Sequence, residues 1–243
     1  MKRTGMTLPI MVSASVFGGA IVAGGALNTW NGSGQNWNEG AYWSAGVPAA
    51  GQEVVVNGDV LLTNATPALA SLTVNAGRTL TFDGWSTALH AEAVDVYGTL
   101  THTNNTATAT NESGAWEPNA RVWVVCSNFT AHADGEIEVA GKGYGVNTSV
   151  SSGNGYGPGG GPSGSSSGSG GAGGAGHGSL GGYDTYPGGS CYGSPDFPEQ
   201  PGSGGGRHAT QTTLGTGGGA IRIDADGAVA INGTLAANGR SVG

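Results

Sequence analysis

Two pairs of carboxylates stand at alternate positions of apolar segments, the spacing that places both side chains on one side of a strand. Glu136 and Glu138 form one pair, and Asp224 and Asp226 form the other. Alternate strand residues lie about 6 to 7 Å apart, within reach of paired-carboxylate hydrolysis or of a calcium ion. Nothing in the sequence places an apolar pocket around either pair, so we interpret both as a solvated outer face.

An aromatic cluster near the N-terminus is the next candidate. Trp30, Trp37, Tyr42 and Trp43 fall within a few residues of one another. Their faces suit the stacking of sugar rings, but a stack of strands also needs an apolar cap over its first layer. We favour the cap and keep the glycan-stacking platform as the alternative.

Soft metal ligands are few in the glycine-rich part of the chain. His177, Cys191 and His208 follow no zinc spacing, and the Gly-x-Gly strings lack the strand-then-helix context of a nucleotide site. We predict no catalytic residue, no cofactor and no metal.

Threonines align in two copies of a short repeat. Thr79 and Thr81 match Thr99 and Thr101, an array that binds ice in some β-helical proteins. The next copy has Glu136 at the first of these offsets, so the array stops after two layers and ice binding is the least favoured function.

The chain contains two cysteines, Cys126 and Cys191. In an exported protein they can form one disulfide that ties the glycine-rich segment to the rest of the chain. The alternative is two unpaired thiols, and sequence fixes neither distance nor orientation.

The elements that must position these residues are strands. Four segments share an apolar-x-apolar run, a glycine turn and a second apolar residue: residues 72–82, 94–100, 129–139 and 229–237. Val74 and Val96 are 22 positions apart, close to one coil of a right-handed parallel β-helix. A β-sandwich shows similar alternation, but single-glycine turns at repeating offsets favour the β-helix, so we predict a mainly β solenoid.

Glycine dominates residues 141–219, which hold 30 of the chain's 50 glycines. A flexible linker has little use for the tyrosines and prolines found there. We therefore predict an ordered insertion of extended, polyglycine- or polyproline-II-like passes, with a disordered linker as the alternative.

The expected organisation has four parts. Residues 1–26 read as a bacterial-type signal peptide, so we expect export and no membrane span after cleavage. Residues 27–140 are the cap and first strands, 141–219 the glycine-rich insertion, and 220–243 a last strand layer. That layer has no cap in the sequence, so either the sequence is a fragment of a longer protein or the open edge pairs with another copy. We expect self-association, head to tail or into fibres.

The net charge of −8, with eight basic residues, gives no electrostatic footprint for nucleic acid or anionic lipid. We exclude nucleic acid as a partner.

Two sets of segments carry a family resemblance: an N-terminal set, residues 28–34, 36–37, 41–48 and 52–56, and a glycine-rich set, residues 138–144, 157–161, 173–178, 192–194, 201–206 and 217–223. The first set resembles the opening of large bacterial secreted or surface β-helix proteins, including adhesins and autotransporter passengers, and the second is similar to their glycine-rich module. The resemblance implies a role in adhesion, in matrix or as a stalk.

These patterns predict a secreted or cell-surface structural or adhesive protein that assembles into fibres or matrix without catalysis. The alternative is a β-helix that binds or cleaves carbohydrate, with extracellular polysaccharide as its partner.

Overall fold

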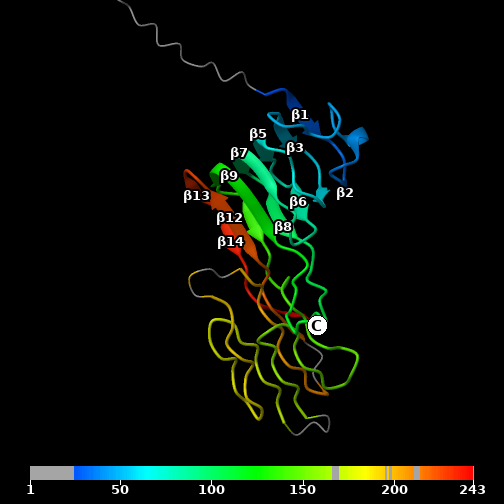
Figure 1. The fold of residues 1–243 in the computed structure, drawn as a ribbon, viewed down its shortest axis with the longest axis vertical. Helices are drawn as coiled ribbons and strands as arrows, with labels where there is room; N and C mark the ends of the chain where they lie inside the picture. Colours follow the sequence, from blue (N-terminus) through cyan, green and yellow to red (C-terminus); the bar gives the residue numbers. More distant parts are fainter. Residues whose placement is uncertain (1–24, 166–169, 195, 197–198, 211–213, 243) are drawn as a thin grey trace, which may run out of the picture.

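The computed structural model describes residues 25–165, 170–194, 196, 199–210 and 214–242, and these form a mainly β structure with parallel sheets (Figure 1). The expected signal peptide, residues 1–26, lies almost wholly outside the described residues. Among the described residues the one helical element is the short 3-10 helix η1 (Gly40–Tyr42).

Two parallel sheets make up what we call the sheet body. The first has the order β1 (Leu27–Trp30), β3 (Glu53–Val56), β5 (Leu69–Val74), β7 (Leu89–Val96), β9 (Val122–Ala131) and β12 (Ile221–Ala225), and β13 (Val229–Ile231) also pairs with β9. The second has the order β2 (Gln35–Asn36), β4 (Val60–Leu62), β6 (Thr79–Phe82), β8 (Thr99–His102), β10 (Glu136–Glu138) and β14 (Thr234–Ala236). A separate antiparallel pair joins β11 (Leu214–Thr216) to β15 (Arg240–Val242).

From β3 to β10, successive strands alternate between the two sheets, so each strand lies beside the strand two earlier in the chain. The register confirms the alignment of the four sequence segments. Paired residues run Leu72, Val94, Phe129, Val229 in the first sheet and Leu80, Leu100, Ile137, Leu235 in the second. Parallel pairing throughout both sheets differs from the hairpin-linked pairing of a β-sandwich.

The core lies between the sheets because every second strand residue is apolar and points inward. Leu72, Val94, Leu100 and Phe129 are all buried. The turns stack as closely as the strands: a Cβ on Gly135 would lie 2.1 Å from the carbonyl oxygen of Val96. Glycine is therefore required at the repeating turn, which explains its fixed offset in the sequence.

The described part of residues 141–219, here called the glycine body, extends below the sheets in Figure 1 as a set of extended passes. Backbone hydrogen bonds join passes that are far apart in sequence. The N–H of Gly143 donates to the carbonyl of Gly217 at 2.8 Å, and that of Gly161 donates to Gly204 at 3.0 Å. The described part of this segment is therefore an ordered body and not a structureless linker.

The passes lie too close together for side chains. A Cβ on Gly155 would lie 1.8 Å from the carbonyl oxygen of Gly204, and a Cβ on Gly204 would lie 1.8 Å from that of Gly145. Close approach of backbones is thus the reason for the composition of this segment.

Candidate functional site

The N-terminal tryptophans close the first layer of the sheet body. Trp30, Trp37 and Trp43 are no more than 5% exposed and pack ring against ring. The indole of Trp43 donates to the carbonyl of Trp37 at 2.7 Å, and that of Trp30 donates to the carbonyl of Asp59 at 3.0 Å. Buried rings offer no face to a sugar, and of the four aromatic candidates only Tyr42 is exposed.

The acidic pairs do not converge on a shared site. Glu136 is exposed, whereas the Glu138 carboxylate accepts the N–H of Ala140 at 2.8 Å and lies 3.7 Å from the Arg240 guanidinium. Asp224 pairs with Arg222, and Asp226 is exposed. Within the described residues no three His, Cys, Asp or Glu side chains are placed to share a metal ion.

The threonine columns exist but are short. Thr79 pairs with Thr99 and Thr81 with Thr101, and Glu136 follows Thr99 in the same column. The array therefore has two layers, as its sequence offsets indicate.

The two cysteines are free thiols in the structure, which agrees with the alternative of two unpaired thiols and not with a Cys126–Cys191 disulfide. Cys126 is buried in β9, where burial raises the pKa of its thiol, and Cys191 is exposed in the glycine body. The inward position of Cys126 follows from strand alternation and keeps its sulfur away from the surface of the glycine body. His177 packs against Tyr192, and His208 lies beside Thr210.

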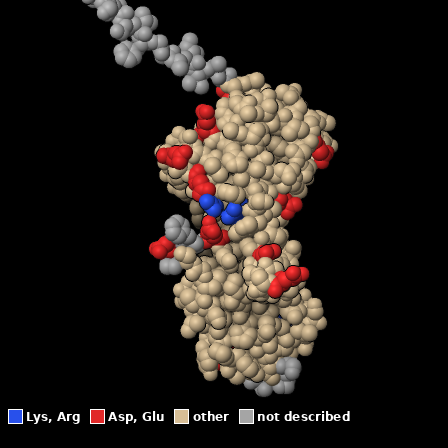
Figure 2. Space-filling model, viewed as in Figure 1, with Lys and Arg blue, Asp and Glu red and all other residues tan. Residues whose placement is uncertain are grey.

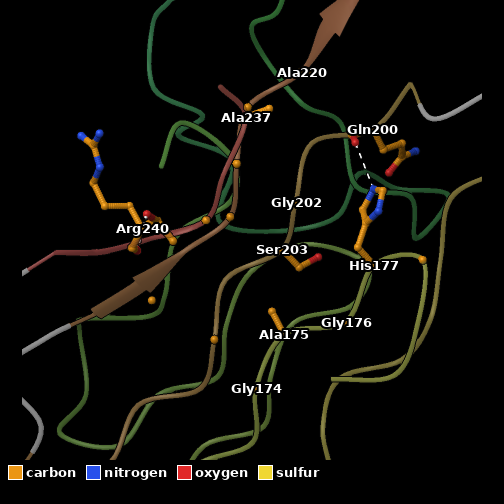
Figure 3. A pocket seen from close by; sticks show the side chains of 18 of the residues that line it. Gly174, Ala175, Gly176, His177, Gln200, Gly202, Ser203, Ala220, Ala237 and Arg240 are labelled. Carbon is orange, nitrogen blue, oxygen red and sulfur yellow. Dashed lines mark hydrogen bonds between the residues drawn. The ribbon is translucent and has the colours of Figure 1, made fainter. Parts of the chain in front are cut away.

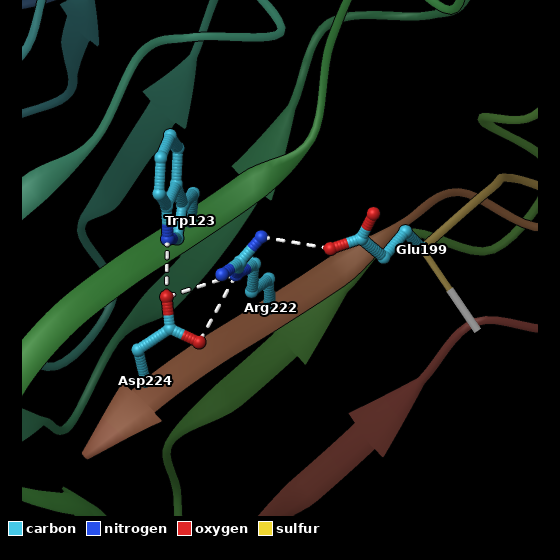
Figure 4. A network of polar contacts seen from close by, with 4 residues as sticks. All are labelled: Trp123, Glu199, Arg222 and Asp224. Atoms are coloured by element: carbon cyan, nitrogen blue, oxygen red, sulfur yellow. Dashed lines mark hydrogen bonds and ion pairs between the residues drawn. The ribbon is translucent and has the colours of Figure 1, made fainter. Parts of the chain in front are cut away.

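A charged and aromatic network lies where the glycine body meets the first sheet. The Ile-Arg-Ile-Asp alternation of β12 points Arg222 and Asp224 outward, and the register sets Arg222 beside Trp123 of β9. The Arg222 guanidinium contacts the Asp224 carboxylate at 2.8 Å and the Glu199 carboxylate of the glycine body at 2.8 Å (Figure 4).

Aromatic rings hold the cations of this network. Arg121 lies 4.5 Å from the ring centre of Trp85 and 4.2 Å from that of Trp123, while Arg222 lies 5.0 Å from Trp123. Burial opposes ionisation of Asp224, but hydrogen bonds from Arg222 and Trp123 hold its pKa below the ordinary value. Figure 2 shows a few basic side chains close together near the middle of the molecule, with acidic side chains around them.

The network is therefore a clamp between β12 and the glycine body. The sequence interpretation missed it, although outward arginines in a chain with eight basic residues were a usable signal.

An apolar face is left open at one edge of the sheet body. Strands β13 and β14, here called the edge layer, carry Val229, Ile231 and Leu235 at 50%, 39% and 49% exposed. Their register partners Phe129, Ala131 and Ile137 are fully buried. These three residues thus repeat the inward pattern of the core, and no further strand layer covers them in the part of the chain that the structure describes.

A groove of about 880 Å³ runs between the edge layer and the glycine body (Figure 3). Leu235, Ala237 and Arg240 line one side, and His177 and Ser203 lie on the glycine-body side. Its walls are largely glycine backbone. The groove therefore presents a concave backbone surface with unpaired strand edges, and few reactive side chains.

Among the described residues there is no helix long and apolar enough to cross a bilayer. Comparison with protein-family models, with curated proteins and with solved structures gave no match to the chain.

Proposed function

We propose that this chain is an exported structural or adhesive protein of the cell surface or extracellular matrix that acts without catalysis and self-associates through its edge layer. Its sheet body is a right-handed parallel β-helix, and the glycine body is an insertion of polyglycine-II-like passes. Alternation of strands between two in-register parallel sheets supports the first assignment. Close backbone hydrogen bonding between glycine passes supports the second.

The observation that carries self-association is the open apolar row of the edge layer. Val229, Ile231 and Leu235 occupy positions that are filled and covered in the preceding layers. Complete burial of a fully exposed side chain of this kind contributes about 1.5–3 kcal/mol. These three are already about half-buried, so covering them with a further layer gains part of that amount for each.

The partner we assign to this edge is a second copy of the chain. Strand edges in natural proteins are commonly protected by charges, prolines or bulges. Strands β13 and β14 read Val-Ala-Ile and Thr-Leu-Ala, with no charge and no proline. Two copies related by a two-fold axis can therefore bring these uncharged strands together.

Sedimentation and light scattering of the purified chain across a range of concentrations test this proposal. We expect dimers for the unaltered chain, because pairing about a two-fold axis closes at two copies. We expect monomers for Ile231→Lys and Leu235→Lys, which place a charge in the edge layer. Leu180→Lys is the matched control, because Leu180 is 73% exposed on the glycine body and should leave assembly unchanged. A chain that stays monomeric at high concentration, or edge variants that assemble like the control, would overturn the proposal.

A further inference from the structure

A second groove, of about 520 Å³, lies on the side of the glycine body and involves no residue of the edge layer. One wall is the loop between β8 and β9, and the other is formed by the first passes of the glycine body. The loop is held in place there, since the N–H of Asn105 donates to the carbonyl of Lys142 at 3.1 Å. Six lining residues matter to its chemistry: Thr108, Thr110, Trp116, Asn147, Asn154 and Tyr156.

Aromatic packing fixes the rings of this groove. The Trp116 ring lies 5.4 Å from that of Tyr144 at 69°, and 6.0 Å from that of Tyr156 at 47°. Tyr144 is fully buried, whereas Trp116 and Tyr156 are half-buried and line the groove. The buried Tyr144 ring thus anchors Trp116, which packs in turn against Tyr156. This gives the site rigid apolar surface at little cost in side-chain entropy.

The two asparagines present oriented donors. The side-chain oxygen of Asn147 accepts the N–H of Ser149 at 3.0 Å, and that of Asn154 accepts the N–H of Ser163 at 2.8 Å. Those bonds fix each amide, whose NH2 group makes no hydrogen bond with the described residues. Thr108 and Thr110 are exposed beside them and add hydroxyl groups. Donors and acceptors therefore surround the aromatic surface.

Charge is absent from the described residues that line the groove, although the chain as a whole is acidic. An ionic ligand finds no counter-charge here. A neutral saccharide matches the surface, because its ring has an apolar C–H face for Trp116 and Tyr156 and hydroxyls for the amides. The volume lies within the usual range for small-ligand sites.

We propose that the groove around Trp116 and Tyr156 binds a neutral saccharide, which gives the protein an adhesive function beyond its structural one. The site does not depend on self-association, since its residues lie in the β8–β9 loop and the glycine body. The N-terminal tryptophans, which the sequence offered as a glycan platform, take no part in it.

The test is titration calorimetry with neutral oligosaccharides of glucose, mannose and N-acetylglucosamine, run in parallel with an oligogalacturonate and a proline-rich peptide. We expect at least one neutral oligosaccharide to bind, and Trp116→Ala to weaken that binding about tenfold or more. Asn154→Asp keeps an acceptor for Ser163, but it replaces the NH2 donor with a charged carboxylate oxygen, so we expect a loss of about three- to tenfold without a change in fold. Tyr183→Ala is the matched control, because Tyr183 is an aromatic residue 77% exposed outside the groove.

Titrating the Leu235→Lys chain as well separates this result from the test of self-association. Saccharide binding by that monomeric variant is expected to equal that of the unaltered chain. The proposal fails if no neutral saccharide binds, if the acidic sugar or the peptide binds instead, or if Trp116→Ala and Asn154→Asp both bind like Tyr183→Ala. None of these outcomes bears on edge pairing, which is measured without sugar.

Discussion

The sheet body and the glycine body are both ordered, but different parts of the residue hold them together. Apolar side chains such as Leu72 and Phe129 fill the sheet body, and each strand buries them against the layers on either side. The glycine body has almost no side chains between its passes, and carbonyl oxygens occupy the space that a Cβ would need. One region is stabilised by burial of side chains, and the other by backbone hydrogen bonds between passes that glycine allows to lie close together.

The difference shows how a segment poor in apolar residues can remain ordered. Glycine loses more conformational freedom on folding than any other residue. In the glycine body this loss is offset by backbone hydrogen bonds between passes and by a few aromatic anchors. Tyr144 is fully buried, and its burial raises the pKa of its hydroxyl to about 12, while the Tyr192 hydroxyl donates to the carbonyl of Pro201 at 2.6 Å.

The largest expected effect belongs to the sheet body. Phe129 is fully buried in β9, between β7 on one side and β13 on the other. Phe129→Ala should lower the free energy of unfolding by about 3–5 kcal/mol, because it removes a large side chain and leaves a cavity. Denaturant unfolding followed by circular dichroism measures this change. A loss below about 1 kcal/mol would contradict the view that side-chain burial stabilises this body.

The glycine body should respond to the opposite change, the addition of a methyl group. At Gly155 the new Cβ would lie 1.8 Å from a carbonyl oxygen, so Gly155→Ala should cost about 1–3 kcal/mol by forcing the passes apart. Gly145→Ala is the matched control, since a Cβ there meets nothing within 4 Å. Its effect should be neutral, or stabilising by at most about 1 kcal/mol.

Hydrogen exchange resolved by mass spectrometry can locate the change. Faster exchange in Gly155→Ala should appear in residues 143–161 and 201–207, with β5, β7 and β9 less affected. Equal effects of the two alanine variants would show that close approach of backbones does not control this body.

The smallest expected effect concerns His102, at the junction of the two bodies. Its ring Nδ1 lies 2.6 Å from the carbonyl of Thr103, and its Nε2 accepts the N–H of Ala220, which leads into β12, at 3.2 Å. Burial lowers the pKa of His102 from 6.5 to about 4, so the unfolded chain binds one more proton between these pH values. The contribution of neutral His102 to the free energy of unfolding is therefore fully present above about pH 6.5. It falls as the pH drops toward 4, with a slope of at most about 1.4 kcal/mol per pH unit.

Urea unfolding at pH 7, 6 and 5 checks this slope. His102→Asn should be less stable at pH 7 and should lose most of the decline between pH 6 and 5, where carboxylates contribute little. An unchanged slope in the variant would assign the pH dependence to other groups.

Much of the sheet body could be predicted from the sequence. The offsets of the glycine turns place Leu72 beside Val94, and Val94 beside Phe129, because repeated layers can stack in only one register if the apolar residues are all to face inward. The aromatics and prolines in residues 141–219 likewise predicted an ordered segment. In both cases the prediction depends on residue types that recur at short distances along the chain.

The candidate sites were less predictable. Arg222 contacts Trp123 and Glu199 because β12, which follows the glycine body in the sequence, pairs with β9, which precedes it. The residues next to Arg222 in the sequence therefore do not indicate its partners. The groove at Trp116 likewise needs a loop and two glycine passes that the repeat does not contain. From the sequence, the alternation of Ile221, Arg222 and Ile223 indicates only that Arg222 faces outward.

By itself the sequence determined the strand alternation, the turn positions and the need for glycine, since these depend on side-chain size and period along the chain. The tertiary structure alone decided that the tryptophans Trp30, Trp37 and Trp43 are buried, that Cys126 and Cys191 stay apart, and which residues meet at the clamp and in the two grooves. The physical reason is that inward or outward position follows from neighbouring residues, whereas contact between distant segments follows from how the glycine body packs against the sheets.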